Sequence, residues 1–262
     1  MELNLGGKVA VVTGGSLGIG RAIAEELAGE GANVVIVARD AGRLDAVAGE
    51  LCARGGGRVV ACAGDMTKAA DIDAAMEAAH RTFGRVDILV NNAGASPMGR
   101  IADTLDATWE KSLLLKLMGY VRCARAVLPG MRQRRWGRVV NIIGRSGHQP
   151  RAAYLAGGAV NAALLNFTLA LAEECAPDNV LVTGVNPGPV QTPRWDTLVA
   201  QGAAIANRDA GAESATALAS IGLSRIGRPE DVSGLVAFLC SDRAAFITGT
   251  CINIDGGGTR CI

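Results

Sequence analysis

The stretch that decides the fold is Thr13-Gly14-Gly15-Ser16-Leu17-Gly18-Ile19-Gly20. An apolar, β-branched run at residues 9–12 precedes it, with the length and composition of a strand buried on both faces. Residues 21–28 follow with apolar side chains at helical spacing and no proline. The pattern therefore predicts a strand, a glycine turn and a helix. Such a turn brings backbone N–H groups and the positive end of the helix dipole against a pyrophosphate, so we predict a dinucleotide site.

The same alternation continues along the chain. Strand-like runs recur at residues 9–12, 34–37, 59–63, 86–90, 139–143 and 180–185, with a short one near 251–254. Helical stretches rich in Ala, Leu, Glu and Arg lie between them. Alternating β and α units predict an α/β fold, a doubly wound parallel sheet with helices on both faces. In such sheets, ligands bind beyond the carboxyl ends of the strands.

Composition limits the class of protein. With 262 residues, 49% hydrophobic and 3% aromatic, we expect a single domain over residues 1–262 with an aliphatic core. A formal charge of +1 gives no field for nucleic acid or an anionic membrane, and we expect no stretch long enough to span one. The N-terminus lacks a basic and apolar leader, which predicts a cytoplasmic protein. Seven cysteines without a C-x-x-C pair and two isolated histidines predict no metal site.

Arg39 follows the second predicted strand. At this point a carboxylate contacts the adenosine ribose in NAD sites, whereas an arginine accommodates the 2′-phosphate of NADP. Ala38 has no carboxylate for the ribose, whereas Arg39 suits a 2′-phosphate, so the sequence favours NADP(H) over NAD(H). The alternative is a surface arginine at the start of the next helix.

Polar and small residues follow the third and fourth strands. Asp65 and Met66 offer a carboxylate and a backbone turn where an adenine edge can rest, although Asp65 is equally suited to cap the next helix. Residues 91–94, Asn-Asn-Ala-Gly, place amides at a strand end, where they can tie neighbouring strand ends together and contact a ribose.

Taken together, these motifs resemble the short-chain dehydrogenase/reductase family over nearly the whole chain. The match rests on the glycine turn, Asp65, residues 91–94, Tyr154, residues 186–192 and the late segments 225–232, 247–249 and 255–257. The resemblance implies a single Rossmann-type domain, a nicotinamide cofactor, a small-molecule substrate and a homotetramer or homodimer. It assigns cofactor contacts to Gly14, Ser16, Leu17, Gly18, Ile19, Gly20, Asp65, Met66, Asn92, Ala93, Gly94, Tyr154, Pro187, Gly188, Val190 and Thr192. Leu17 departs from the basic residue of many NADP-preferring members, so the case for the 2′-phosphate rests on Arg39.

The family's catalytic residues are only partly present. Members use a tyrosine, a lysine four residues later, a serine after the fifth strand and an asparagine in the preceding helix. Tyr154 matches, but Gly158 stands for the lysine, Gly144 for the serine and Lys116 for the asparagine. The usual mechanism therefore cannot be transferred unchanged.

We hypothesise that Lys116 replaces the absent lysine. Its long stem can carry a positive charge toward the Tyr154 phenol and the nicotinamide ribose, into space left by Gly157 and Gly158. The alternative is that Lys116 extends outward from an apolar helix and has no role.

Other side chains are candidate substrate contacts. Ser146, two residues past Gly144, is a candidate for the missing hydroxyl. His148 in the same loop is a candidate acid or base. The alternative for both is an ordinary turn whose polar groups face solvent. The segment at about 192–226 is expected to cover the substrate. In it, Trp195 can provide an apolar surface and Arg194 can contact an anionic group, or both side chains can serve only to pack this covering segment.

The sequence thus predicts an NADP(H)-dependent oxidoreductase that interconverts a carbonyl and an alcohol on a small, largely apolar substrate. Tyr154 is the predicted acid/base, with Lys116 and Ser146 as its partners. Two alternatives remain: a non-redox enzyme such as an isomerase, dehydratase or proton-transfer catalyst on the same nucleotide fold, and a catalytically silent nucleotide-binding protein.

Overall fold

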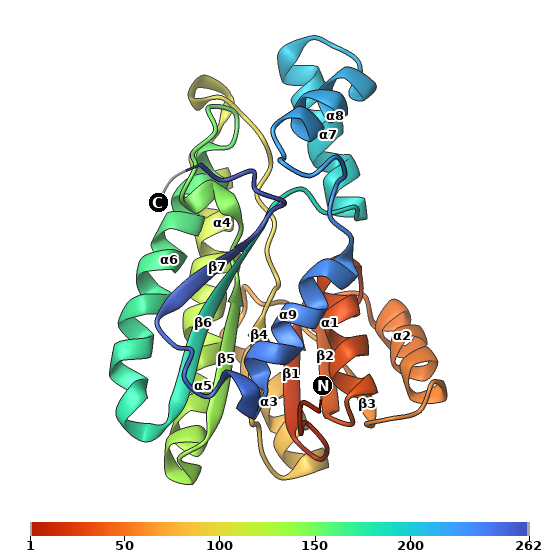
Figure 1. Ribbon diagram of the computed structural model, residues 1–262, viewed down its shortest axis with the longest axis vertical. Coiled ribbons are helices and arrows are strands. Elements are labelled where there is room, and N and C mark those ends of the chain that lie inside the picture. The colour runs from red at the N-terminus through yellow and green to blue at the C-terminus, as the bar shows by residue number, and fades with distance from the viewer. Residues whose placement is uncertain (1, 261–262) are drawn as a thin grey trace.

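The computed structural model describes residues 2–260 and contains a seven-stranded parallel sheet (Figure 1). Its order is β3-β2-β1-β4-β5-β6-β7. The strands are β1 (Val9–Thr13), β2 (Asn33–Ala38), β3 (Val59–Ala63), β4 (Ile88–Asn91), β5 (Gly137–Ile142), β6 (Val180–Pro187) and β7 (Thr250–Ile254). All seven predicted strands are present, and the doubly wound α/β fold is confirmed.

Helices cover both faces of this sheet. They are α1 (Gly18–Gly29), α2 (Ala41–Ala53), α3 (Ala69–Phe83), α4 (Asp106–Ser112), α5 (Gly119–Arg134), α6 (Leu155–Cys175), α7 (Pro193–Ala206), α8 (Ala210–Ala219) and α9 (Pro229–Cys240). One core joins α1, α2 and α9 to the sheet, and a second joins α3, α5 and α6 to the opposite face. Every residue of β1, β4, β5 and β6 is buried, as expected for parallel strands covered on both faces.

Helix α6 corrects one expectation. Among residues 2–260, the segment Leu155–Asp178 is long and apolar enough to cross a membrane by length and composition, so the expectation that no stretch approaches that length was wrong. Half of its most apolar stretch is buried, and the helix packs on β6 as part of the core. Apolar residues on all sides of a helix are typical of a helix buried in a large domain, and nothing here indicates a membrane protein.

The chain reverses direction across the sheet between β1 and β4. From β1 it adds β2 and β3 on one side, then returns to place β4 on the other. At such a switch point the loops leave in opposite directions and open a crevice at the carboxyl ends of the strands.

Helices α7 and α8 stand off this end of the sheet (top of Figure 1). The Thr192 side chain caps α7 by accepting a hydrogen bond from the backbone N–H of Trp195, and Asp209 caps α8 through the N–H of Ala212. The segment expected to cover the substrate therefore folds as a helical pair beside the crevice.

Candidate functional site

The glycine turn after β1 can bring its backbone close to a ligand because its four glycines lack side chains. Gly14 and Gly18 have positive φ angles of 69° and 54°. A Cβ on Gly20 would lie 2.2 Å from the Gly14 carbonyl oxygen. Leu17, the N-cap of α1, makes no side-chain capping bond, so the turn presents the first N–H groups of the helix. This cradle fits the pyrophosphate of a dinucleotide.

Asn92 and Thr13 hold this turn in place. The Asn92 side-chain amide donates to the carbonyl oxygens of Thr13 at 3.0 Å and Gly14 at 3.2 Å. In return, Thr13 Oγ1 accepts from the backbone N–H groups of Asn92 and Ala93 at 2.9 and 3.1 Å. The expectation that these amides tie neighbouring strand ends together is thus confirmed.

Asp65 and Arg39 lie together at the ends of β3 and β2. Asp65 Oδ1 accepts the Thr67 backbone N–H at 2.9 Å, and this bond lowers the pKa of the carboxyl, helped by the nearby charges of Arg39 and Lys68. Asp65 forms a turn and does not cap α3, whose N-cap is Lys68. Arg39 is exposed, and Met66 is buried beneath them.

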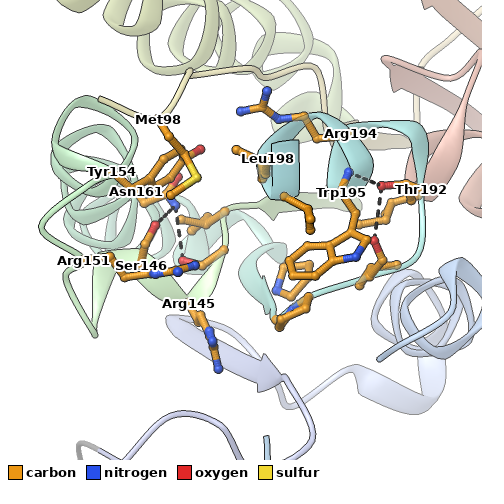
Figure 2. Close-up of a pocket in the computed structure, with 18 of the residues that line it drawn as sticks. Met98, Arg145, Ser146, Arg151, Tyr154, Asn161, Thr192, Arg194, Trp195 and Leu198 are labelled. Carbon is orange, nitrogen blue, oxygen red and sulfur yellow. Dashed lines mark hydrogen bonds between the residues drawn. The ribbon is translucent and has the colours of Figure 1, made fainter. Parts of the chain in front are cut away.

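A pocket lies between the main body of the fold and α7 (Figure 2). It gathers predicted site residues from segments far apart in the sequence: Ile19, Gly144, Ser146, Tyr154, Pro187, Gly188, Val190, Thr192, Arg194 and Trp195. Sequence reasoning missed several others, including Met98, Arg145, Arg151, Asn161, Leu198 and Glu213. His148 is exposed and is not among the residues that line the pocket.

Tyr154 precedes α6, and its ring folds back over the first turn of that helix. A Cβ on Gly157 would lie 2.1 Å from Tyr154 Cζ and 2.6 Å from the phenol oxygen. A Cβ on Gly158 would meet only the Ser146 carbonyl oxygen, at 3.4 Å. The two glycines therefore differ: Gly157 makes room for the phenol ring itself, whereas we had interpreted the pair together as a space for Lys116.

Lys116 lies on a π-helical turn, Leu113–Met118, between α4 and α5. Its amine points into the protein and donates to the Ile143 carbonyl oxygen at 2.5 Å and to Asn161 Oδ1 at 2.7 Å. Gly94 gives its stem a path, because a Cβ there would lie 2.9 Å from Lys116 Cδ. Burial, and to a smaller extent the charge of Arg194, lowers the pKa of the Lys116 amine to about 7.

Asn161 connects Lys116 to Ser146. Its Nδ2 donates to Ser146 Oγ at 2.7 Å and to the Gly144 carbonyl oxygen at 3.4 Å (Figure 2). A protonated amine only donates hydrogen bonds, so Asn161 must turn its oxygen to Lys116 and its NH₂ group to Ser146. Ser146 Oγ thus accepts from Asn161 and keeps its own hydrogen for another partner.

The sequence contains one weak sign of Asn161. It lies seven residues after Tyr154, two helical turns away on the same face, and is a polar residue in an apolar helix. No metal cluster competes with this interpretation, because no group of three or more His, Cys, Asp or Glu suitable for a metal occurs within residues 2–260.

Comparisons with known proteins identify the family of this chain. A model described as short chain dehydrogenase matches residues 8–203. The 3-oxoacyl-[acyl-carrier-protein] reductase of Aquifex aeolicus is 35% identical over 98% of this chain and 99% of its own. The 2-(S)-hydroxypropyl-CoM dehydrogenase 3 of Xanthobacter autotrophicus is 36% identical over 99% of both chains.

Solved structures are similar along the full length. The L-sorbose reductase of Gluconobacter frateurii, in complex with NADPH and L-sorbose, has a TM-score of 0.93 and 36% identity over 100% of both chains. A variant of actinorhodin polyketide ketoreductase with NADPH has a TM-score of 0.92 and 32% identity, covering 96% of this chain and 97% of its own. This chain therefore belongs to the short-chain dehydrogenase/reductase family of oxidoreductases.

Proposed function

We propose that this protein is an NADP(H)-dependent oxidoreductase that interconverts a carbonyl and an alcohol on a small molecule. The observation that carries the proposal is the hydrogen-bonded chain from Lys116 through Asn161 to Ser146, in the pocket that also contains Tyr154. It supplies a buried amine and an oriented hydroxyl at the carboxyl end of the sheet, although the family's lysine and serine positions are both glycine here.

The cofactor would bind along the strand ends. The glycine turn, with Ser16, Leu17 and Ile19, would hold the pyrophosphate. Asp65 and Met66 would contact the adenine. The nicotinamide ribose would lie against Asn92, Ala93 and Gly94. Pro187, Gly188, Val190 and Thr192 would face the nicotinamide end. When bound, the nicotinamide ring would donate or accept a hydride. Preference for NADP(H) is supported by Arg39 and by the NADPH in the related reductase structures.

Tyr154 is the proposed acid/base. In the reduction direction its phenol donates a proton to the carbonyl oxygen, and in oxidation it takes the proton back. The hydroxyl hydrogen of Ser146 is directed to the same oxygen, because Ser146 Oγ already accepts from Asn161. Ser146 thereby supplies the hydroxyl that Gly144 lacks.

Lys116 has two proposed tasks. It fixes the Asn161 amide, and it brings positive charge to the site. A protonated amine has three donors, and two are used by Ile143 and Asn161, so one remains for the nicotinamide ribose or the phenol. Within residues 2–260 no hydrogen bond joins Lys116 to Tyr154, so we assign Lys116 to Ser146 and Asn161 first.

The helical pair α7–α8 is the proposed cover of the substrate. Trp195 and Leu198 of α7 would close the pocket on one side and exclude water from the reacting carbonyl. We also propose that the protein is cytoplasmic and forms a homotetramer or homodimer. The oligomer is supported by large apolar side chains exposed on neighbouring helical segments, Leu113, Leu114 and Leu169.

The Lys116 pKa of about 7 favours one second candidate, a proton-transfer enzyme such as an isomerase, because such a group is half protonated at neutral pH. Nicotinamide absorbance, followed with a panel of cyclic and linear ketones and alcohols, decides between them. Oxidation of NADPH by a ketone supports the oxidoreductase; conversion of a compound with no change in absorbance supports the second candidate.

Replacing Lys116 or Asn161 should separate chemistry from cofactor binding. Lys116→Met and Asn161→Leu are each expected to lower kcat roughly a hundredfold or more, because Ser146 loses the hydrogen bond that orients its hydroxyl and the site loses the charge or the amide that supports it. The Kd for NADPH should change by less than about tenfold. Lys111→Met, an exposed lysine one helical turn away, is the matched control and should behave like the wild type. Near-normal kcat in Lys116→Met would contradict the proposal.

The adjacent glycines provide a second matched pair. Gly157→Ala pushes the Tyr154 ring from its position and should lower kcat more than about tenfold. The methyl group of Gly158→Ala would make only an ordinary contact with the Ser146 carbonyl oxygen, at 3.4 Å, so this variant should keep its activity while stabilising α6 by about 1 kcal/mol. Turnover and thermal unfolding of both variants test this, and equal kcat in the two would show that the ring position is unimportant.

Cofactor choice should depend on Arg39. Arg39→Ala is expected to weaken NADPH binding about tenfold relative to NADH, because a charge-assisted bond to the 2′-phosphate is lost. The exposed Arg43, four residues on in α2, provides the control Arg43→Ala. Fluorescence titration of both cofactors measures the ratio. A ratio that does not move in Arg39→Ala would remove the basis for NADP preference.

A further inference from the structure

The pocket carries more positive charge than its carboxylates balance. Arg145, Arg151 and Arg194 all line it, and Glu213 is the one acidic residue among the lining residues of the described chain, 2–260. Burial, and then the nearby charge of Arg151, lowers the pKa of Arg145, while Asp255 partly opposes this shift. Such an arrangement is stabilised when an anion enters.

The Glu213 carboxylate already forms an ion pair with Arg208. Its side chain is 8% exposed, and its Oε2 accepts from both Nε and Nη2 of Arg208, the first at 2.9 Å. Arg151 approaches the other oxygen, Oε1, only to 3.8 Å. Within residues 2–260 Arg151 donates no hydrogen bond to a protein acceptor, so its planar set of five donors is available to a ligand.

Arg194 approaches the pocket from the opposite side. It starts from the first turn of α7 (Figure 2). Its Nη2 donates to the Ser96 carbonyl oxygen. Its charge also acts on the buried Lys116 amine. Arg151 thus extends from the body of the fold toward Glu213 of α8, and Arg194 extends from α7 toward Ser96 of the body, so both cations line the pocket between these parts.

Arg145 adds a third cation at the edge near the C-terminal segment. Its Nη2 donates to Ser220 Oγ at 3.1 Å, and its buried Nη1 has no hydrogen-bond partner in the described chain, residues 2–260. Apolar groups complete the lining, among them Met98, Ile143, Trp195 and Leu198. The pocket therefore combines an apolar wall with more guanidinium groups than carboxylates, which suits a site for an amphiphilic anion.

We propose that the substrate carries an oxyanion, a carboxylate or a group of similar geometry, on an apolar body, and that Arg151 recognises it, with Arg194 and Arg145 supplying the surrounding positive field. This rests on the proposed oxidoreductase function for the identity of the substrate, and it replaces the expectation of a largely apolar one. Arg151 is a specificity residue at a distance from the reacting carbonyl.

Binding of a matched acid and amide tests this without turnover. Isothermal titration calorimetry with saturating NADP⁺ compares 4-phenylbutanoate with 4-phenylbutanamide, which differ in charge and little in shape. The acid should bind the wild type about tenfold more tightly or better, as expected for a charge-assisted bidentate bond. Arg151→Leu should remove the difference, while the exposed and distant Arg243→Leu should keep it.

Glu213→Gln separates recognition from a merely structural role of Arg151. If Arg151 only fastened α8 through Glu213, both Arg151→Leu and Glu213→Gln would reduce acid binding alike. Anion recognition instead predicts that Glu213→Gln keeps or increases the preference for the acid, because a competing carboxylate is gone. Circular dichroism confirms that each variant is folded.

The outcomes distinguish this inference from the proposed function. Equal binding of acid and amide by the wild type, no binding of the acid, or a preference that survives Arg151→Leu would each overturn the anion site. A preference that depends on Arg151, together with no change in nicotinamide absorbance with any keto acid, would support the anion site and contradict the oxidoreductase.

Discussion

The interaction on which the site depends is the contact of one buried amine with one side-chain amide. Lys116 directs its ammonium into the protein, where the Ile143 carbonyl and Asn161 Oδ1 are its acceptors. Because an amine of this kind donates and an amide has one accepting and one donating end, the first bond sets the direction of the second. That second bond reaches Ser146. A single buried cation therefore orients the hydroxyl in the pocket.

This arrangement requires space in three places, and glycine provides each one. Gly94 lets the Lys116 stem pass, Gly157 leaves room for the Tyr154 ring, and Gly144 adopts a positive φ of 117° that turns the chain toward Ser146. A side chain at the first two positions would collide with the groups that form the site. Of these three glycines, only Gly144 departs from the family pattern. Together with Gly158 and Lys116 it is consistent with our proposal that a neighbouring helix supplies the cation.

Much of the fold was readable in the sequence because each signal was local. A β-branched run before a glycine turn and an apolar helix is a short-range pattern, and all seven strands followed from such runs. Lys116 was found because it stands at a position that the family resemblance marks. Asn161 was missed because its importance comes from a contact with a residue 45 positions away, which no spacing rule encodes.

Other features depend on tertiary structure and so left little trace in the sequence. The π-helical turn that carries Lys116 has the composition of an ordinary apolar helix. Arg151 precedes Tyr154 by a short turn, and its position near Glu213 depends on where α8 packs. Ser146 and His148 were candidates for different roles in the loop after β5, and one turn of backbone leaves Ser146 buried and His148 exposed.

The pKa of Lys116 is the most direct test of whether its amine is buried as described. The chain has four lysines, so NMR of lysine labelled at Cε with ¹³C can resolve each titration, and Lys116→Met identifies the signal. The account predicts a pKa near 7 for Lys116, below the usual value of about 10.4 for a lysine in water. Since the unfolded chain would still bind the proton between these values, the free energy of unfolding should rise with pH across that range, and Lys116→Met should abolish this contribution. A Lys116 pKa near that of an exposed lysine would contradict the account.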